Sequence, residues 1–272
     1  MRKFCSVHTH STLCDGRSTL AEMAAAAFEA GAVSFGASGH SHTEIPWDRG
    51  CVLPADPAAY RAEVLRLREE YAGRMDVLLG IEQDSLTDQP VPDWADYWIG
   101  SVHNLRRPGG FASVDYSPEK LEEDCRALFQ GDFLEMAAAY YAEAAAMAAR
   151  RPTILGHIDL VTKFNEGGAL FDESDPRYRT AALDALHAAD PAATLLEINT
   201  GAMSRGYRSA PYPAPFLLEA WRDMGGRIIL TADAHSAGNI VYGYDRAAEL
   251  ARAAGFARAA VLTAGGIEEY PL

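Results

Sequence analysis

The sequence predicts an α/β protein whose mainly parallel sheet closes, or nearly closes, into a barrel. Segments of strand and helix character alternate about seven times along the 272 residues, and this rhythm is typical of parallel sheets. With about seven such units, a barrel is favoured over an open doubly wound sheet. No GxGxxG motif follows the first strand and the sequence contains no GxxxxGK[ST], which disfavours nucleotide-binding folds.

The first half of the chain supplies four predicted strands and two helices. The strands are expected in a short apolar segment from Phe4, then over Ala32–Ser38, Met75–Ile81 and Tyr97–Val102. The helices are expected from a capping box, Thr19 to Glu22, as far as Gly31, and from the N-cap pattern Asp56-Pro57 as far as Gly73. Glu82 and Asp84 follow the third strand, and His103 follows the fourth.

The second half continues the same alternation. Helices are expected after Ser117-Pro118, from about Asp132 to Arg150, over 174–189, from Pro213 to Met224 and over 238–254. Strands are expected over Thr153–Gly156, from Thr194 towards Asn199 and over Arg227–Ala232, with a strand or hairpin in 259–272. No low-complexity linker or long charge run interrupts the pattern. Residues 1–272 are therefore expected to form a single domain.

The composition of the chain limits which classes of partner and which cell compartment are expected. The net charge of −14 argues against a nucleic-acid partner, whereas a small phosphorylated substrate stays possible if bound cations reverse the local field. Four cysteines (Cys5, Cys14, Cys51 and Cys125) form no CxxC pair, which suits a reducing compartment. A signal-peptide core and an 18-residue apolar run are both absent, so we expect a cytoplasmic protein without a membrane partner. The sequence does not indicate the oligomeric state.

Histidines gather at the predicted strand ends. His8 and His10 are two residues apart in an extended segment, so their side chains share a face. Seven of the eight histidines lie at or just beyond a strand end: His8, His10, His40, His42, His103, His157 and His235. Asp15, Glu82 and Asp233 are interleaved with them. In a barrel all these positions meet at one face, where the chemistry of such folds is found.

The number of candidate ligands indicates the kind of site. A single catalytic zinc needs about three protein ligands and an open position, whereas this sequence offers roughly nine. That number suits two or three divalent ions, and histidine-rich ligation favours Zn, Fe or Mn over Mg. Clustered ions suit phosphoester hydrolysis, because they acidify a bound water and neutralise phosphate charge. A carboxylate such as Glu82 can bridge two of them.

Taken in order, these motifs resemble the PHP (polymerase and histidinol phosphatase) superfamily. They are His8-Thr9-His10-Ser11, Asp15, Gly39-His40-Ser41-His42, Glu82, His103, Gly156-His157-Ile158-Asp159 and Asp233-Ala234-His235. The resemblance implies a distorted TIM-like barrel of seven βα units with a trinuclear metal site. One ion would take His8, His10, Glu82 and Asp233, a second Glu82, His103 and His157, and a third Asp15, His40 and His235.

Within the superfamily the chain is similar to the histidinol-phosphate phosphatase branch. The supporting stretches are Leu196–Gly201, Tyr212–Pro215 and Ser236–Tyr244. The resemblance implies hydrolysis of L-histidinol phosphate to histidinol and phosphate, a reaction of histidine biosynthesis. The attacking group would be a hydroxide that bridges two metals, with Glu82 as the bridging carboxylate.

Charged residues after the strands are candidates for substrate contacts. Arg205, Arg208 and Lys163 could hold the phosphate, although each could also be a solvated surface charge. His42 resembles a residue that contacts phosphate or protonates the leaving oxygen, with a purely structural role as the alternative. The candidates for orienting the imidazoles or contacting substrate are Asp84, Asp159, Glu197 and Asn199.

Three alternative functions are also compatible with features of the sequence. Another PHP phosphoesterase could act on a nucleotide or a different small phosphate ester. An amidohydrolase-like barrel that cleaves C–N bonds also uses an HxH strand and a late aspartate, but Asp15, His40 and His235 would then have no ion to hold. A metal-storage or regulatory protein would bind metal without releasing phosphate.

Overall fold

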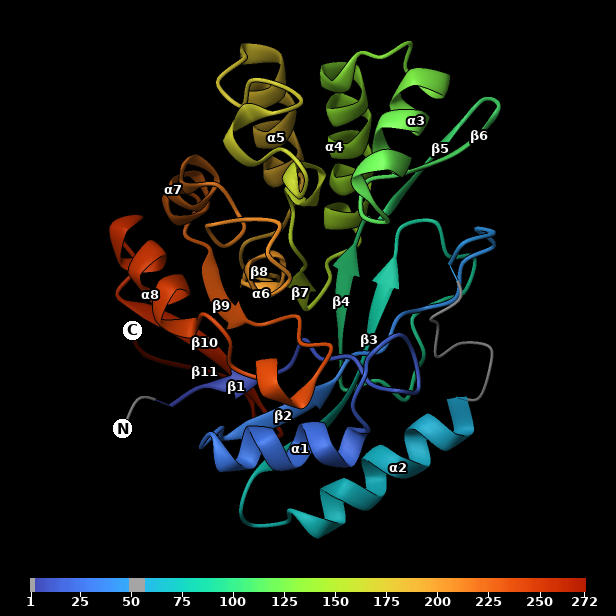
Figure 1. The fold of residues 1–272 in the computed structure, drawn as a ribbon. Coiled ribbons are helices and arrows are strands. Elements are labelled where there is room, and N and C mark those ends of the chain that lie inside the picture. The colour runs from blue at the N-terminus through green and yellow to red at the C-terminus, as the bar shows by residue number, and fades with distance from the viewer. Residues whose placement is uncertain (1–2, 49–56) are drawn as a thin grey trace.

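The computed structural model describes residues 3–48 and 57–272. Within them, nine strands form a sheet in the order β1-β2-β3-β4-β7-β8-β9-β10-β11, which curls into a half-barrel (Figure 1). The strands are β1 (Cys5–Ser6), β2 (Ser34–Ala37), β3 (Asp76–Asp84), β4 (Tyr97–Ser101), β7 (Ile154–Leu155), β8 (Leu195–Asn199), β9 (Arg227–Thr231), β10 (Arg258–Thr263) and β11 (Gly266–Pro271). Neighbours from β1 to β10 run parallel, and β11 returns antiparallel.

Helices surround the outside of the curled sheet (Figure 1). They are α1 (Leu20–Glu29), α2 (Pro57–Glu70), α3 (Pro118–Leu128), α4 (Phe133–Ala149), α5 (Pro176–His187), α6 (Gly201–Ser204), α7 (Pro215–Asp223) and α8 (Tyr244–Ala253). The capping box between Thr19 and Glu22 is present at the start of α1. Two residues of the sequence analysis, the predicted N-cap Asp56 and the cysteine Cys51, lie outside the described residues. No described helix combines the length and apolar character that crossing a membrane requires.

Two local predictions differ from the structure, and the structure adds elements that were not predicted. Strand β3 runs through Glu82 and Asp84, because both residues still pair with β4, so these carboxylates lie in the strand and not after it. The last helix was expected from residue 238 but begins only at Tyr244, because Gly243 has a left-handed φ of 71°, which is incompatible with a continuous right-handed helix. The hairpin of β5 (Asn104–Arg107) and β6 (Gly110–Ser113) and the short α6 were not predicted.

A backbone bridge joins the segments that follow β1 and β9 beside the site. Thr9, just after β1, forms an isolated parallel bridge with Ala234, just after β9. The His10 amide donates to the Ala234 carbonyl over 2.8 Å, and the Ala234 amide donates to the His8 carbonyl over 3.1 Å. This bridge brings residues from the two ends of the chain into one place. The distorted, TIM-like barrel predicted from the sequence is confirmed.

Tyr97 fills the inside of the barrel below the site. Its ring lies against Gly36 and Gly80, where an added Cβ would be 2.4 and 2.3 Å from its nearest Tyr97 atom. Its hydroxyl donates to the Val7 carbonyl over 2.6 Å. The ring therefore supports the strand that leads directly into His8.

Replacing Gly80 by alanine should destabilise the protein by about 1–3 kcal/mol, because the buried ring has no room to move aside. Urea unfolding of the purified variant measures this change. Gly265→Ala is the control: its added Cβ would lie 3.6 Å from Thr263 Oγ1, an ordinary contact. Equal stability of the two variants would contradict the packing role given to Tyr97.

Candidate metal centre

The structure brings the nine candidate ligands together at the carboxyl ends of the strands. Glu82, only 1% exposed, lies at the centre and faces five imidazoles. Its carboxylate oxygens lie 3.4 Å from His8 Nε2, 3.4 Å from His10 Nε2, 2.9 Å from His40 Nδ1, 3.3 Å from His103 Nε2 and 3.1 Å from His157 Nε2. One buried carboxylate thus contacts side chains from four separate segments of the chain.

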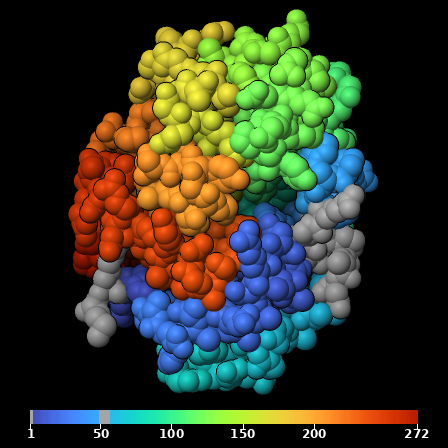
Figure 2. Space-filling model, viewed as in Figure 1, coloured from blue at the N-terminus to red at the C-terminus, as the bar shows by residue number. Residues whose placement is uncertain are grey.

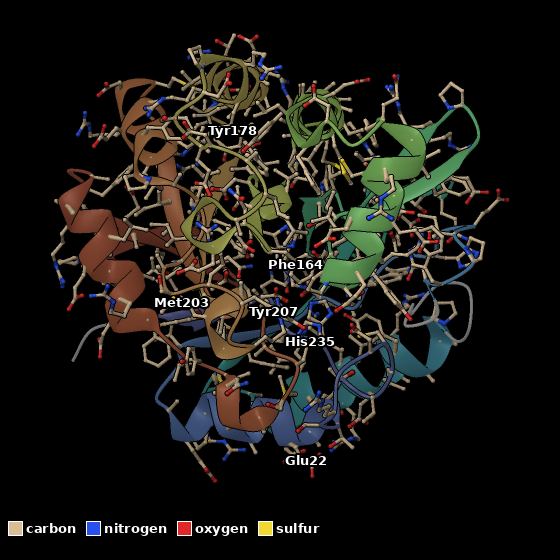
Figure 3. All side chains as sticks on the ribbon, turned by 45° about the horizontal axis from the view of Figure 1, so that its top comes forward. Glu22, Phe164, Tyr178, Met203, Tyr207 and His235 are labelled. Carbon is tan, nitrogen blue, oxygen red and sulfur yellow. The ribbon has the colours of Figure 1, made fainter. Side chains whose placement is uncertain are left out.

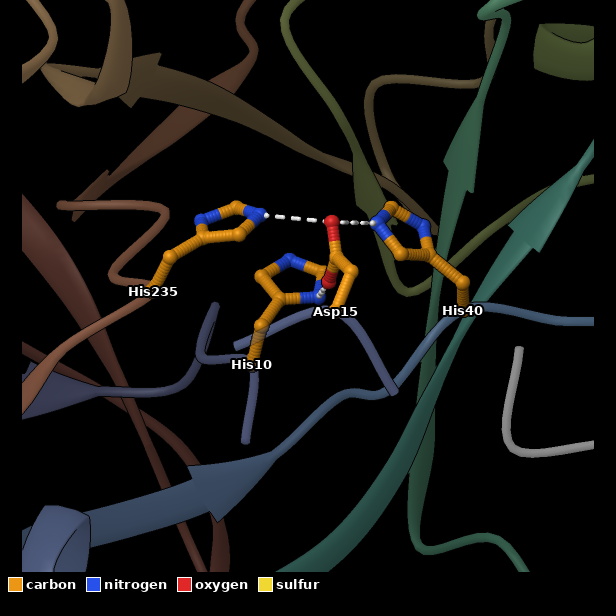
Figure 4. Close-up of side chains that lie close together, drawn as sticks. All are labelled: His10, Asp15, His40 and His235. Atoms are coloured by element: carbon orange, nitrogen blue, oxygen red, sulfur yellow. Dashed lines mark ion pairs between the residues drawn. The ribbon is translucent and has the colours of Figure 1, made fainter. Parts of the chain in front are cut away.

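Four overlapping groups of these side chains have donor atoms close enough to share an ion. The groups are His8, His10 and Asp233; His8, Glu82 and His157; His40, Glu82 and His103; and His10, Asp15, His40 and His235. Within each group the donor atoms lie within 4.8 Å of one another. In the last group, Asp15 Oδ2 lies 3.2 Å from His235 Nε2 and 3.5 Å from His40 Nε2 (Figure 4).

Unpartnered buried atoms test whether cations fit this arrangement. His8 Nε2, His10 Nε2 and Glu82 Oε2 are buried and make no hydrogen bond with other described residues. Leaving such atoms unpaired is costly, yet all three converge on the same place. Imidazole nitrogens and carboxylate oxygens are the donors that Zn, Fe and Mn accept. The donor set therefore fits divalent metal ions.

The charge of the site also fits cations. Burial opposes ionisation of Glu82, but the imidazoles of His8 and His40 hold the pKa of this carboxyl well below its usual value. The pKa of Asp233 is likewise held well below its usual value, because Arg205 and His8 outweigh the effect of burial. Ionised carboxylates gathered in a buried place require compensating positive charge.

Two further carboxylates orient the imidazoles. Glu197 Oε1 accepts from His8 Nδ1 over 2.5 Å, and Asp84 Oδ2 accepts from His103 Nδ1 over 3.0 Å. Both contacts turn the opposite ring nitrogen, Nε2, towards Glu82. Carboxylate–histidine pairs of this kind are typical of metal sites. Asp159 differs, since its Oδ2 accepts from the Ala214 amide and burial raises its pKa to about 6.

Asp84→Asn should lower metal affinity by about 10–100-fold. Both carboxylate oxygens of Asp84 accept hydrogen bonds, from His103 and from the Leu86 amide, so an amide must turn an NH₂ towards one donor. Competition with a chromophoric chelator measures the affinity. The exposed Asp88→Asn variant is the control, and an unchanged affinity in Asp84→Asn would refute the orienting role.

A cavity of about 650 Å³ opens beside the ligand cluster. Figure 2 shows this hollow where segments from the beginning, middle and end of the chain meet. Three cationic side chains line it: Arg17, Lys163 and Arg205. Arg205 Nη2 lies 2.9 Å from Asp233 Oδ2, which fixes the guanidinium at the border between ligands and cavity.

Arg208 and His42 are not among the residues that line this cavity, and their substrate contacts stay predictions. The guanidinium of Arg208 donates to the Thr162 carbonyl over 2.8 Å and pairs with Glu166 and Glu173. These contacts hold it beside the cavity wall. His40 pairs with Glu82 as an isolated bridge, and His42 lies two residues further on, partly buried and outside the strands.

Several cavity residues were not predicted from the sequence. Asp115 and Tyr116 come from the loop between β6 and α3, and Tyr207 follows α6. The Tyr207 and Phe164 rings, labelled in Figure 3, meet edge to face at 5.1 Å, and Tyr207 lines the cavity together with His235. No strand end precedes Asp115 in the sequence pattern. The helix start at Ser117-Pro118, which places a loop just before it, was the one available signal.

Comparisons with known proteins agree with this geometry. The PHP domain family matches residues 6–201. A Deinococcus radiodurans protein designated a probable histidinol-phosphatase is 34% identical over 256 residues, covering 88% of this chain and 89% of its own. The histidinol-phosphatase of Bacillus subtilis is 25% identical over 262 residues, covering 88% of this chain and 96% of its own.

A solved structure shares the fold. Histidinol phosphate phosphatase from Lactococcus lactis, in complex with zinc, L-histidinol and phosphate, has a TM-score of 0.66 at 20% identity and covers 98% of both chains. A Listeria monocytogenes structure assigned to the same activity has a TM-score of 0.74 at 20% identity, covering 89% of this chain and 98% of its own. The chain therefore belongs to the PHP domain family, in the branch that contains the histidinol-phosphatases.

Proposed function

We propose that this protein is a metal-dependent phosphomonoesterase that hydrolyses L-histidinol phosphate to L-histidinol and phosphate. The observation that carries the proposal is the position of Glu82, buried among five imidazoles at the edge of a cavity whose lining includes three cationic side chains. Relatives designated histidinol-phosphatases, which align over most of the chain, support the substrate. Residues 1–272 would act as one phosphoesterase domain.

The proposed cofactors are two to three divalent ions, Zn, Fe or Mn. The proposed ligands are His8, His10, Asp15, His40, Glu82, His103, His157, Asp233 and His235, and the overlapping donor groups among them support more than one ion. When bound, such ions supply an acidified water and neutralise phosphate charge. Glu82 has the central role, since it can contribute to two ions at once.

The chain's own cations would hold the phosphate. Arg205 and Lys163 both line the cavity, and a guanidinium and an ammonium are the usual partners of phosphate oxygens. We assign this contact to these two residues and not to Arg208 or His42. Asp84 and Glu197 would act through the imidazoles that they orient.

The test combines elemental analysis of the purified protein with phosphate-release assays. We expect two to three ions per chain and a kcat/KM for L-histidinol phosphate well above that for nucleoside monophosphates and p-nitrophenyl phosphate. A higher kcat/KM for a nucleotide would contradict L-histidinol phosphate as the substrate while leaving the phosphomonoesterase chemistry in place. Bound metal without phosphate release from any ester would overturn the proposal in favour of a storage or regulatory role.

A further inference from the structure

The site has two connected compartments that differ in their cations. The larger cavity contains the cations Arg17, Lys163 and Arg205 together with the carboxylates Asp15, Glu82, Asp115 and Asp233. A second cavity of about 280 Å³ adjoins it, and the two share Asp15, His40, His103, Asp115 and Tyr116. Four aspartates line the second cavity, namely Asp15, Asp48, Asp84 and Asp115, and its described lining includes no lysine or arginine. Of the two, only the first compartment offers a lysine or arginine to an anionic group, whereas the aspartates of the second suit a cationic group.

Asp115 lies at the junction and contacts a cation of the first compartment. Its Oδ1 pairs with Lys163 Nζ, and the same ammonium donates to the Asp115 carbonyl over 3.0 Å. The Lys163 side chain is 7% exposed, whereas that of Asp115 is 32% exposed. The lysine is thus held in the wall while the carboxylate stays accessible from both cavities.

The loop that carries Asp115 is fastened to the metal cluster. The Val114 amide donates to the His103 carbonyl over 3.1 Å, and the Asp115 amide donates to Ser113 Oγ over 3.2 Å. Partial desolvation of the Asp115 side chain is outweighed by the Lys163 ammonium, with help from His103 and Arg205, and the pKa of this carboxyl is lowered. The carboxylate is therefore ionised and fixed in place relative to His103.

We propose that Asp115 binds the ammonium group of the substrate and so selects phosphate esters that carry a charged amine on the carbon next to the ester carbon. This inference rests on the proposed phosphatase function and deepens it. A substrate of that class brings an anion and a cation close together, matching Lys163 and Asp115. The single ion pair of the free site becomes two pairs, Lys163 with phosphate and Asp115 with ammonium, so neither charge loses its partner.

The test compares L-histidinol phosphate with its deamino analogue, 3-(imidazol-4-yl)propyl phosphate, on the metal-loaded enzyme. The wild type should prefer the amine-bearing ester by at least about tenfold in kcat/KM, the effect expected of one hydrogen-bonded charge. Asp115→Asn should remove most of this preference, lowering kcat/KM for the amine-bearing ester at least about tenfold more than kcat/KM for the deamino ester. Asp190→Asn is the matched control, because Asp190 is 33% exposed and pairs with Arg151 away from the site.

A binding measurement separates this inference from the proposed activity. Calorimetry on the metal-loaded wild type should show tighter binding of L-histidinol than of its deamino alcohol, and Asp115→Asn should remove the difference. Amine-dependent binding without phosphate release would refute the activity and leave the role of Asp115 standing. Equal binding of the two alcohols by the wild type, or equal losses for both esters in Asp115→Asn, would overturn that role.

Discussion

Glu82→Gln is expected to lower kcat for phosphate release by at least about 10²-fold, the scale on which loss of one electrostatic group in an active site is felt. Glutamine keeps the size of the side chain but loses the charge that faces five imidazoles. It also presents an NH₂ group to nitrogens that must remain free to bind metal. Metal content should fall together with kcat, and both are measured on the same preparation.

The control for this variant is Glu249→Gln on the outer face of α8, where the carboxylate is 58% exposed and pairs with Arg246. It should retain normal metal content and turnover. If Glu82→Gln kept full metal content and near-normal kcat, the central role given to this carboxylate would be refuted.

Metal removal is expected to have the second large effect. Dialysis against a strong chelator should abolish phosphate release and lower the unfolding temperature, because ions that bind only the folded chain stabilise it. Zn, Fe(II) or Mn should restore both properties, and Mg should restore them poorly because the donor set is rich in imidazole. Full activity of the metal-free protein would contradict the proposed chemistry.

The sequence predicted the barrel and the convergence of nine candidate ligands for one physical reason. Parallel strands place their carboxyl ends at one face of the barrel. Residues far apart in the chain, such as His8 and Asp233, can therefore be predicted to lie close together. Strand β3 extends past Glu82, so this residue lies within the strand and not after it. The longer strand moves the predicted strand end by a few residues, but Glu82 still lies at the face of the barrel where the other ligands meet.

Side chains carried by loops did not follow from the same logic. Asp115 reaches the cavity from the loop after an unpredicted hairpin, and strand periodicity contains no information about such an excursion. Arg208 has the charge expected for phosphate, but it pairs with Glu166 and Glu173. Local charge patterns reveal which residues could bind an anion, and only the tertiary structure decides which of them line the cavity.

The bridge between Thr9 and Ala234 has a consequence for the motions of the barrel. Two backbone hydrogen bonds hold this edge, with His8 and His10 on one side and Asp233 on the other. An ion bound to His8, His10 and Asp233 would join the two sides directly and resist their separation. Amide hydrogen exchange at His10 and Ala234 should therefore slow on metal loading more than exchange within the β10–β11 hairpin, so that local opening reports on occupancy of the centre.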